Sequence, residues 1–383
     1  MNKNITFFLM ALKIGFDAKR YFFNNSGLGN YSRSSVSLLS KYYPEDDYVL
    51  FSPKHTDNYH TLLAKNNSMA YPTAGKLKKV PSLWRSYGMS EDINKNNIQI
   101  YHGLSNEIPY DILKASCKSV VTIHDLIFVH MPHLYKPFDR FIYKKKYRDS
   151  CNKADKVIAI SRQTHDDLVN IWNVPTEKID VVYQGCNSIF YDMASDEHKE
   201  NVRLKYNLPR EYILSVGTIE ERKNLGLTLK AMKEGNIDMP LVACGRQTPY
   251  TDELKKYVSE NNMTSKVLFI HNVDFEDLPA IYQMANVSVY ASKYEGFGIP
   301  IIESLNSHTP MITSKGGVFS ETGGDACIYI DNSSVEEMID ALNRAINDTP
   351  LRKEMISKGL DYVKRFADEE VAKNIHAVYE KLY

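Results

Sequence analysis

Short stretches of β-branched and aromatic residues alternate along this chain with longer stretches in which apolar positions recur every three or four residues. The short stretches predict strands, and the longer ones predict amphipathic helices. Because strand and helix alternate throughout, we expect parallel sheets with helices on both faces. Strands are predicted at Leu12–Asp17, Tyr48–Ser52, Ile98–His102, Ser119–His124, Lys156–Ser161, Ile179–Tyr183, Tyr212–Gly217, Leu241–Gly245, Val267–Ile270, Val287–Ala291, Met311–Thr313 and Cys327–Ile330.

Between Gln184 and Arg210 this alternation lapses into a polar stretch, and a new buried strand then begins at Tyr212. Such a stretch is typical of a domain boundary. We therefore predict two doubly wound α/β domains, 1–190 and 191–367, with a C-terminal helix, 368–383, packing back on the first. Ligands of such folds bind beyond the carboxyl ends of the strands, so a site in a cleft between the two domains is expected.

Composition excludes several classes of protein. Of the 383 residues, 43% are apolar and 25% charged, which is ordinary globular usage. Lys plus Arg and Asp plus Glu both number 47, so no global field favours nucleic acid, and no nucleic-acid partner is expected. The five scattered cysteines form no Cys-x-x-Cys pair, which argues against a zinc site and a disulfide framework and favours a reducing cytoplasm.

The N-terminus carries an apolar run, Ile5 to Leu12, that is too short to span a bilayer. It leads directly into the first predicted strand, so cleavage there would cut into the fold. We interpret residues 1–10 as an extension, with Met10 as an alternative start, and we expect a cytoplasmic protein.

The segment from Ala291 to Glu303 carries the strongest signal for chemistry. It follows a strand, turns on Gly296 and Gly298 and has Pro300 where a first helical residue is expected. Glu295 then lies in the loop and Glu303 in the first helical turn, where the helix end would keep it ionised. Backbone amides at Gly296, Phe297 and Gly298 could hold hydroxyls or phosphate, and a carboxylate could accept hydrogen bonds from a vicinal diol such as ribose. Taken singly, each glutamate could equally be a solvated charge.

A second loop, Gly217 to Asn224, closes the first strand of the second domain and contains Arg222 and Lys223. Two cations at the carboxyl end of a strand could neutralise a leaving diphosphate. An ordinary basic pair on a solvated turn is the competing interpretation.

The first domain offers weaker candidates. Gly27 and Gly29 form a Gly-x-Gly turn ahead of a helix expected to begin near Tyr31, but the full dinucleotide-binding motif is absent, which disfavours a nicotinamide dehydrogenase. His102 and His124-Asp125 end two predicted strands, where histidines could contact a sugar or simply be satisfied core residues. No hydrolase elbow and no zinc-binding His-Glu-x-x-His motif occurs.

One basic and aromatic stretch runs from Lys136 to Arg148. It could rest on a lipid surface or bind an anionic acceptor. The interpretation we favour from the sequence is a helix with its aromatic residues in the core and its lysines solvated.

Together and in this order, these motifs resemble the family-4 retaining glycosyltransferases of GT-B fold, a bacterial group with many mannosyl- and glucosyltransferases of surface polysaccharide assembly. The likeness rests on the Gly217 to Asn224 turn, the Glu295-x7-Glu303 pair, His124-Asp125 and the Gly27-Leu28-Gly29 loop. It implies two Rossmann-like domains facing across a cleft, a GDP- or UDP-linked sugar as donor, and no metal or other cofactor.

The resemblance also implies roles for single residues. Glu303 would bind the ribose, Arg222 and Lys223 the diphosphate, and Glu295 with the Phe297–Gly298 backbone the donor sugar. His124 would contact hydroxyls of that sugar. The base would lie near Val273, and Gly29 would approach the phosphates. His102 and Asp125 remain candidates on the acceptor side.

The expected function is transfer of a hexose, for example mannose from GDP-mannose, with retention of configuration, to a glycan or lipid-linked acceptor. Peripheral contact with the inner face of the cell membrane fits this class. Two alternatives stay open: a nucleotide-sugar 2-epimerase of the same architecture, and a sugar-nucleotide-binding scaffold without turnover.

Overall fold

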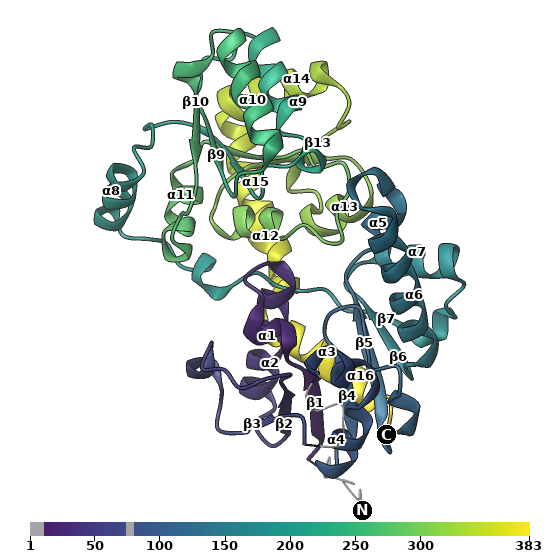
Figure 1. The fold of residues 1–383 in the computed structure, drawn as a ribbon. Helices are drawn as coiled ribbons and strands as arrows, with labels where there is room; N and C mark the ends of the chain where they lie inside the picture. The colour runs from purple at the N-terminus through teal and green to yellow at the C-terminus, as the bar shows by residue number, and fades with distance from the viewer. Residues whose placement is uncertain (1–10, 74–79) are drawn as a thin grey trace, which may run out of the picture. The chain divides into compact units, whose positions relative to one another are not determined.

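The computed structural model describes residues 11–73 and 80–383 (Figure 1). The chain forms two compact units that divide between Gln184 and Gly185, six residues before the predicted boundary. Gly185–Ala367 forms the second unit, and Asp368–Tyr383 belongs to the first. The predicted extension at residues 1–10 and the alternative start at Met10 lie outside the described residues.

The described part of the first unit contains a seven-stranded sheet, and each strand runs parallel to its neighbours in the order β3-β2-β1-β4-β5-β6-β7. The strand order reverses between β1 and β4, where Phe16 pairs with His102. The strands are β1 (Lys13–Asp17), β2 (Asp47–Phe51), β3 (Asn67–Ala70), β4 (Ile100–Gly103), β5 (Lys118–Ile123), β6 (Lys156–Ala159) and β7 (Ile179–Val181).

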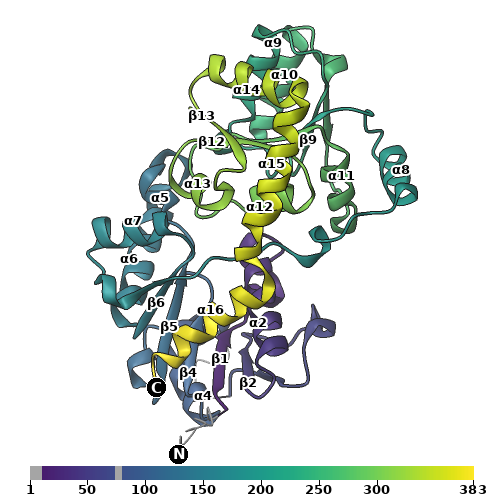
Figure 2. The ribbon, with the colours of Figure 1, turned by 180° about the vertical axis from the view of Figure 1, so that it is seen from behind.

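Helices cover both faces of this sheet. The α-helices are α1 (Lys19–Phe23), α2 (Gly27–Tyr42), α3 (Pro81–Tyr87), α4 (Met89–Lys95), α5 (Ile127–His130), α6 (Pro137–Lys153), α7 (Arg162–Trp172) and α16 (Asp368–Glu380). The 3-10 turns are η1 (His60–Leu62), η3 (Ile112–Lys114), η4 (Pro132–Leu134) and η5 (Thr176–Lys178). Helices α2 and α16 pack together on one face (Figure 2). On the other face, Trp84 of α3, Ile93 of α4, Cys151 of α6 and Trp172 of α7 share one apolar core with the strands.

The second unit repeats this plan with a six-stranded parallel sheet, in the order β10-β9-β8-β11-β12-β13. Its strand order reverses between β8 and β11. The strands are β8 (Ile213–Val216), β9 (Leu241–Cys244), β10 (Val267–Ile270), β11 (Val287–Tyr290), β12 (Met311–Ser314) and β13 (Cys327–Ile330).

The helices of the second unit also lie on both faces of its sheet. The α-helices are α8 (Asp196–Lys205), α9 (Leu225–Glu234), α10 (Pro249–Glu260), α11 (Leu278–Met284), α12 (Ile299–Asn306), α13 (Gly317–Gly323), α14 (Val335–Asn347) and α15 (Thr349–Tyr362). The 3-10 turns are η6 (Ser188–Phe190), η7 (Glu221–Lys223), η8 (Thr264–Lys266), η9 (Phe275–Asp277) and η10 (Val363–Phe366). Apolar residues of α9, α10 and α14 form one core with the sheet.

The twelve predicted strands are all present to within two residues, and the predicted doubly wound α/β class is confirmed. Ser161 caps α7, because its hydroxyl accepts from the Thr164 amide at 3.0 Å. Strand β3 was missed because its sequence, Asn-Ser-Met-Ala, is mostly polar and partly exposed at the edge of the sheet. The helix predicted near Tyr31 begins earlier, at Gly27.

Candidate active site

The candidate site residues of the second unit lie where the sheet reverses its strand order. Strand β8 leads through Gly217 into η7, and the neighbouring strand β11 leads through Ser292 and Glu295 into α12. Parallel neighbours end at the same edge of a sheet, so the two loops that follow them meet there. This is the position at which doubly wound folds bind their ligands.

Glycine and asparagine shape these loops. Gly217 has a φ of 137°, which L side chains rarely adopt. A Cβ on Gly245, at the end of β9, would lie 1.8 Å from the Gly217 carbonyl oxygen, so both positions require glycine. Asn224 adopts a left-handed conformation, and its side-chain amide donates to the carbonyl oxygens of Ala291 at 3.1 Å and Asn332 at 2.8 Å. These bonds hold the β8 loop against the loops that follow β11 and β13.

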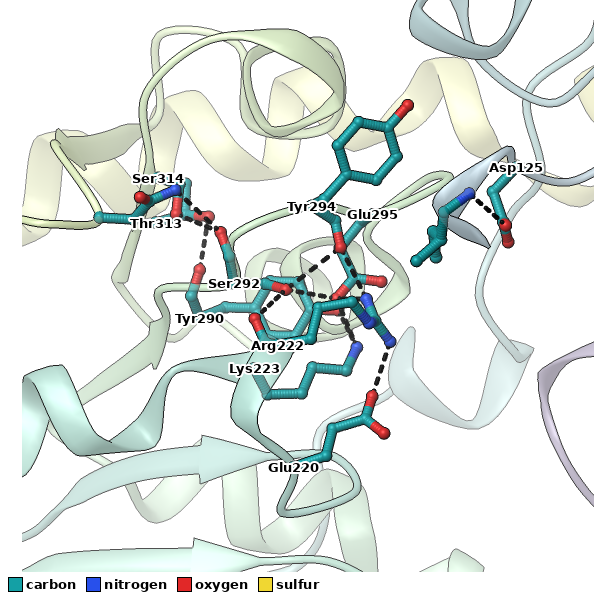
Figure 3. A network of polar contacts seen from close by, with 12 residues as sticks. Asp125, Glu220, Arg222, Lys223, Tyr290, Ser292, Tyr294, Glu295, Thr313 and Ser314 are labelled. Atoms are coloured by element: carbon teal, nitrogen blue, oxygen red, sulfur yellow. Dashed lines mark hydrogen bonds and ion pairs between the residues drawn. The ribbon is translucent and has the colours of Figure 1, made fainter. Parts of the chain in front are cut away.

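A cluster of four side chains joins the two loops, and we call Arg222, Lys223, Ser292 and Glu295 the Glu295 cluster (Figure 3). One carboxylate oxygen, Oε1 of Glu295, lies 2.6 Å from Arg222 Nη1, 2.6 Å from Lys223 Nζ and 2.6 Å from Ser292 Oγ. Two cations and a hydroxyl therefore converge on a single oxygen. The resemblance assigned these three charged residues to parts of one donor, and the structure brings their side chains together.

Electrostatics within the cluster follow from its burial. Burial alone would raise the pKa of Glu295, but Lys223 and Arg222 outweigh it and hold that pKa at about 2. Burial lowers the pKa of Lys223, while Glu295 acts in the opposite direction. Glu295 is therefore a carboxylate throughout the neutral range and is unsuited to donate a proton there.

Further contacts fix the two cations. Arg222 donates to the Tyr294 carbonyl at 2.7 Å and pairs with Glu220 at 2.8 Å. Lys223 Nζ lies 2.5 Å from the Tyr290 hydroxyl at the end of β11. The Lys293 amide donates to the Arg222 carbonyl at 2.8 Å, which adds a backbone link between the loops. The Arg222 guanidinium is thus oriented by groups from both loops, and the Lys223 ammonium by groups from β11 and the loop after it.

Glu303 does not lie in the first turn of its helix, which corrects the sequence-based placement. Helix α12 begins at Ile299, one residue before Pro300, so Glu303 is its fifth residue. The carboxylate accepts from the Tyr282 hydroxyl of α11 at 3.0 Å and is 9% exposed. Burial raises the pKa of Glu303 to about 7, whereas Tyr282 and Lys223 act to lower it. Burial thus opposes the expected effect of the helix end, and near pH 7 the group is divided between its charged and neutral forms.

The predicted glycine loop precedes α12. Gly296, Phe297 and Gly298 are all buried. Gly298 occupies the N-cap position with a φ of 126°, and the Phe297 ring packs edge-on against Phe366 at 5.7 Å. Val273, the residue expected near the base, lies half-buried in the loop after β10, at the same edge of the sheet.

In the first unit, His124 follows β5 and is 6% exposed. Burial lowers its pKa to about 4, although the hydrogen bond to the Leu104 carbonyl acts to raise it, so the ring is neutral at pH 7. Nε2 lies 2.9 Å from that carbonyl oxygen and must carry the proton, which makes Nδ1 the acceptor nitrogen. The Tyr31 ring of α2 packs edge-on against the imidazole at 4.6 Å. Asp125 beside it accepts from the amide of Ile127, the first residue of α5, at 3.0 Å.

His102 is a core residue, contrary to its candidacy on the acceptor side. Its side chain is fully buried, and both ring nitrogens contact hydroxyls, Nδ1 with Tyr379 at 2.7 Å and Nε2 with Thr122 at 2.8 Å. These partners come from α16 and β5. The imidazole ties the C-terminal helix to the sheet and has no surface to offer an acceptor.

Gly27 and Gly29 form the first turn of α2 instead of a loop before it. A Cβ on Gly29 would lie 1.8 Å from the Asn24 carbonyl oxygen, whereas Gly27 faces open space. The Gly29 amide already donates to the Ser26 carbonyl at 2.9 Å and to Asn24 Oδ1 at 3.1 Å. The need for glycine at position 29 is therefore explained by the close approach of Asn24.

Sequence reasoning missed several members of this edge. Three of them are polar residues in or beside apolar stretches: Tyr282, Tyr290 and Ser292. A strand or helix pattern does not show which side chains such residues contact. Asn224 could have been recognised, because asparagine is enriched in the left-handed conformation that ends a turn. The first unit also holds an unpredicted ion-pair cluster of Asp17, Arg85, Glu107 and Lys146, which we call the Arg85 cluster.

Two family models match this chain side by side. Residues 45–188 match the model described as Glycosyltransferase Family 4, and residues 196–361 match the model described as Glycosyl transferases group 1. The first match lies almost entirely in the first unit and the second within the second unit, which contains the Glu295 cluster. The chain belongs to glycosyltransferase family 4.

Curated relatives agree with this family. The O-antigen chain mannosyltransferase B of Escherichia coli is 26% identical over 388 residues, covering 97% of this chain and 100% of the relative. The O-antigen chain mannosyltransferase RfbU of Salmonella typhimurium is 31% identical over 249 residues, covering 64% of this chain and 65% of its own length.

Solved structures of other proteins share the fold. A glycosyltransferase from Rickettsia africae matches with a TM-score of 0.78 at 19% identity, covering 97% of this chain and 98% of that one. Anabaena HepE in complex with UDP and glucose matches with a TM-score of 0.75 at 15% identity, covering 97% of this chain and 100% of that one. With two parallel α/β sheets, this family-4 glycosyltransferase has the predicted GT-B fold.

Among the described helices of this glycosyltransferase, none combines the length and the apolar character needed to cross a bilayer.

Proposed function

We propose that this glycosyltransferase transfers a hexose, mannose in the leading case, from a nucleoside-diphosphate sugar to a glycan or lipid-linked acceptor during assembly of a surface polysaccharide. The two curated relatives described above are both O-antigen chain mannosyltransferases, which supports mannose and a polysaccharide product. The complex of Anabaena HepE with UDP and glucose supports a nucleotide-linked donor.

The main support for this donor site is that Arg222 and Lys223 converge on one oxygen of Glu295. This contact lies where the second sheet reverses its strand order. A nucleoside diphosphate brings negative charge that these two cations can share with Glu295. Arg222 offers a planar fork and Lys223 a compact charge, a combination suited to a diphosphate. We assign both to the diphosphate, and Glu295 with the Phe297–Gly298 backbone to the donor sugar.

Glu303 is assigned to the ribose. Its carboxylate already accepts one hydrogen bond, from Tyr282, and a vicinal diol would donate two more. Hydrogen bonds to the charged form lower a carboxyl pKa. Because the pKa of Glu303 starts at about 7, nucleotide binding at neutral pH should release part of a proton. We place the base near Val273.

The chemistry of transfer follows from these assignments. The bond between the anomeric carbon and the diphosphate breaks, and Arg222 and Lys223 stabilise the charge that develops on the leaving group. Glu295 stays ionised, so it can accept from sugar hydroxyls but cannot protonate the leaving group. We propose a same-face displacement, in which the leaving phosphate takes the proton of the acceptor hydroxyl and the configuration is retained.

In this proposal, His124 is the residue of the first unit that contacts the donor sugar. With Nε2–H held by the Leu104 carbonyl, Nδ1 can accept from a hydroxyl of the donor sugar. His124→Ala should therefore leave UDP or GDP affinity unchanged and lower the transfer rate about tenfold or more. A loss of nucleotide affinity equal to the loss of rate would contradict this division of roles.

Titration calorimetry with GDP, UDP and ADP tests the donor site. We expect one nucleotide to bind clearly more tightly than the others, and proton release measured in buffers of different ionisation enthalpy to disappear in Glu303→Gln. Transfer is then assayed with the matching nucleotide sugar and a panel of lipid-linked and free glycan acceptors. Tight nucleotide binding without transfer to any acceptor, or conversion of the donor into an epimer, would overturn the proposed activity.

A further inference from the structure

Two neighbours in the first unit orient the imidazole of His124. The Leu104 carbonyl oxygen lies 2.9 Å from Nε2. The Tyr31 ring of α2 packs edge-on against the imidazole, with the ring centroids 4.6 Å apart and the ring planes at 88°. Among residues 11–73 and 80–383, no group forms a hydrogen bond with Nδ1. A rotation about the bond between Cβ and Cγ would move both ring nitrogens, and these two contacts oppose it.

The backbone of His124 is anchored independently of Tyr31. The His124 amide donates to Asn106 Oδ1 at 2.7 Å, and the His124 carbonyl oxygen accepts from the Thr164 hydroxyl at 3.3 Å. Neither bond involves α2. A substitution at Tyr31 should therefore change the freedom of the imidazole more than the position of the chain that carries it.

Tyr31 is itself held at the far end of its ring. Its hydroxyl lies 3.2 Å from the Thr122 hydroxyl of β5, and the Thr122 hydroxyl lies 2.8 Å from His102 Nε2. His102 Nδ1 lies 2.7 Å from the Tyr379 hydroxyl of α16, the helix that packs on α2. All four side chains are buried. We call Tyr31, Thr122, His102 and Tyr379 the Tyr31 network; it runs from the C-terminal helix to the ring beside His124.

The Tyr31 network carries no charge near neutral pH. Burial and, to a smaller extent, His124 lower the pKa of His102 to about 3, so its ring is neutral. Burial raises the pKa values of Tyr31 and Tyr379, so both hydroxyls keep their protons. The network therefore stays intact across the neutral range. A buried polar network in which each member has a partner holds its side chains in one arrangement.

The proposed function makes a specific demand on the His124 ring. Nδ1 can accept from a hydroxyl of the donor sugar only while the proton is on Nε2 and the ring keeps one orientation. The Leu104 carbonyl fixes the position of the proton. One hydrogen bond leaves a ring free to tilt about it, and the packed Tyr31 ring restricts that tilt. A group that is oriented before the reaction stabilises the transition state without a cost of reorganisation.

We propose that Tyr31 is a positioning residue for His124, and that Thr122, His102 and Tyr379 keep the Tyr31 ring in place. Tyr31 touches no substrate in this proposal and acts through the imidazole. The effect on transfer rests on the proposed function, in which His124 contacts the donor sugar. The effect on the ring of His124 does not depend on it.

Nitrogen-15 NMR of the histidine side chains tests the positioning role without any transfer reaction. The chain has 11 histidines, so the signals of His124 are assigned by their absence in His124→Gln. Wild type should show the Nε2–H tautomer alone, because Nε2 donates to the Leu104 carbonyl. Tyr31→Leu removes the ring and should give a mixture of tautomers. Unchanged His124 signals in Tyr31→Leu would overturn the proposal.

Transfer kinetics give the second measurement. Tyr31→Leu should lower kcat about threefold to tenfold, the range that one aromatic pair supplies, while KM for the nucleotide sugar stays within about twofold. Tyr31→Phe keeps the ring but loses the contact with Thr122, and it should lower kcat about twofold. Thr122→Val removes the same contact from the other side and should match Tyr31→Phe. These two variants provide both measurements if Tyr31→Leu does not fold.

Tyr48→Phe is the matched control for a lost buried hydroxyl. Tyr48 is fully buried in the first unit, and its hydroxyl lies 3.1 Å from the carbonyl oxygens of Leu39 and Tyr43 at the carboxyl end of α2. The control should lose about as much unfolding free energy as Tyr31→Phe and keep the kcat of wild type. An equal fall of kcat in both variants would show a general loss of stability and overturn the proposal.

A double-mutant cycle separates this inference from the proposed function. Because Tyr31 acts through the imidazole, Tyr31→Leu should cause no further fall of kcat in a His124→Ala protein. The same fall in both backgrounds would overturn the proposal. If His124→Ala transfers sugar like wild type while Tyr31→Leu still changes the His124 signals, the role of His124 in the proposed function is wrong, and its positioning by Tyr31 is supported.

Discussion

Both sheets reverse their strand order once, and at both reversals a buried ion cluster follows, yet the two clusters differ in how their charge is balanced. In the Arg85 cluster, Arg85 bridges Asp17 and Glu107, and Lys146 completes the chain at 2.8 Å from Glu107. Two cations meet two largely buried carboxylates. In the Glu295 cluster, Arg222 and Lys223 share one oxygen of one buried carboxylate, and the further acid, Glu220, is 37% exposed.

We propose that this difference separates a closed cluster from one that takes up an anionic ligand. Burial would raise the pKa of Glu107, but Arg85 and Lys146 hold it at about 2, and Asp17 with Glu107 raises the pKa of Arg85. Each buried charge in the first unit thus has an opposite partner, and an added anion would face two carboxylates. In the second unit an added diphosphate would improve the balance of charge. Substitutions in both clusters test this contrast.

The largest effect is expected from Arg85→Ala. The substitution leaves Asp17 and Glu107 buried without their shared cation, and breaking a buried pair in this way costs about 3–5 kcal/mol. Denaturation followed by tryptophan fluorescence measures it, because Trp84 and Trp172 both belong to the first unit. Arg85→Lys keeps a charge and should recover part of the loss. A folded Arg85→Lys protein that bound nucleotide much more weakly than wild type would contradict the idea of a closed, structural cluster.

Glu303→Gln should stabilise the protein in a pH-dependent way. The pKa of Glu303 is about 7 when folded against an ordinary value near 4.5, so the unfolded chain loses this proton first as pH rises. Stability from the raised pKa is complete below about 4.5, declines as pH rises, and is lost above about 7. At 1.36 kcal/mol per pKa unit the loss is roughly 3 kcal/mol at most.

The measurement is the free energy of unfolding of wild type and Glu303→Gln at pH 5 and pH 8. The glutamine oxygen can still accept from Tyr282, so the hydrogen bond is kept. We expect a small difference between the two proteins at pH 5 and a higher stability for Glu303→Gln at pH 8. Equal effects at both pH values would mean that Glu303 is ionised throughout, as the helix-end argument from sequence had it.

Much of this contrast could be predicted from sequence, but not all of it. The Arg222-Lys223 turn and the Glu295 loop follow directly after strands that are neighbours in a doubly wound sheet, so their meeting was predictable. The Arg85 cluster joins residues 68 positions apart, from β1 and α3, with a loop residue and α6. No periodic pattern signals such a meeting.

Other errors have the same origin. His102 looked available at the end of a strand, but α16, which returns from the far end of the sequence, covers it through Tyr379. Glu303 was misplaced because the position of its helix start decides whether it belongs to the first turn, and sequence locates helix ends only to within a few residues. Phe138 and Phe141 of α6, which are 72% and 68% exposed, were assigned to the core because a helical pattern alone does not reveal how a helix is rotated against its sheet.

Lys223→Ala should weaken nucleotide binding about tenfold to 100-fold, since a hydrogen bond to a charged group is worth about 1.5–3 kcal/mol. Lys146→Ala is the matched variant, because each lysine pairs with a buried carboxylate that a neighbouring arginine also contacts. Calorimetry with the preferred nucleotide compares the two. If the Arg85 cluster is closed to ligands, Lys146→Ala leaves the nucleotide affinity unchanged. An equal loss of nucleotide affinity in both variants would contradict the proposed difference between the two clusters.

The smallest effect is expected at an exposed pair that bridges the same two loops. Lys293 and Glu221 lie 3.0 Å apart, but their side chains are 36% and 50% exposed. Exposed pairs of this kind contribute less than about 1 kcal/mol, and the Lys293 amide would keep its bond to the Arg222 carbonyl in Lys293→Ala. Both unfolding free energy and nucleotide affinity should therefore stay close to wild type. If Lys293→Ala weakened nucleotide binding as much as Lys223→Ala, position in the loop, and not burial against Glu295, would be what makes a cation important here.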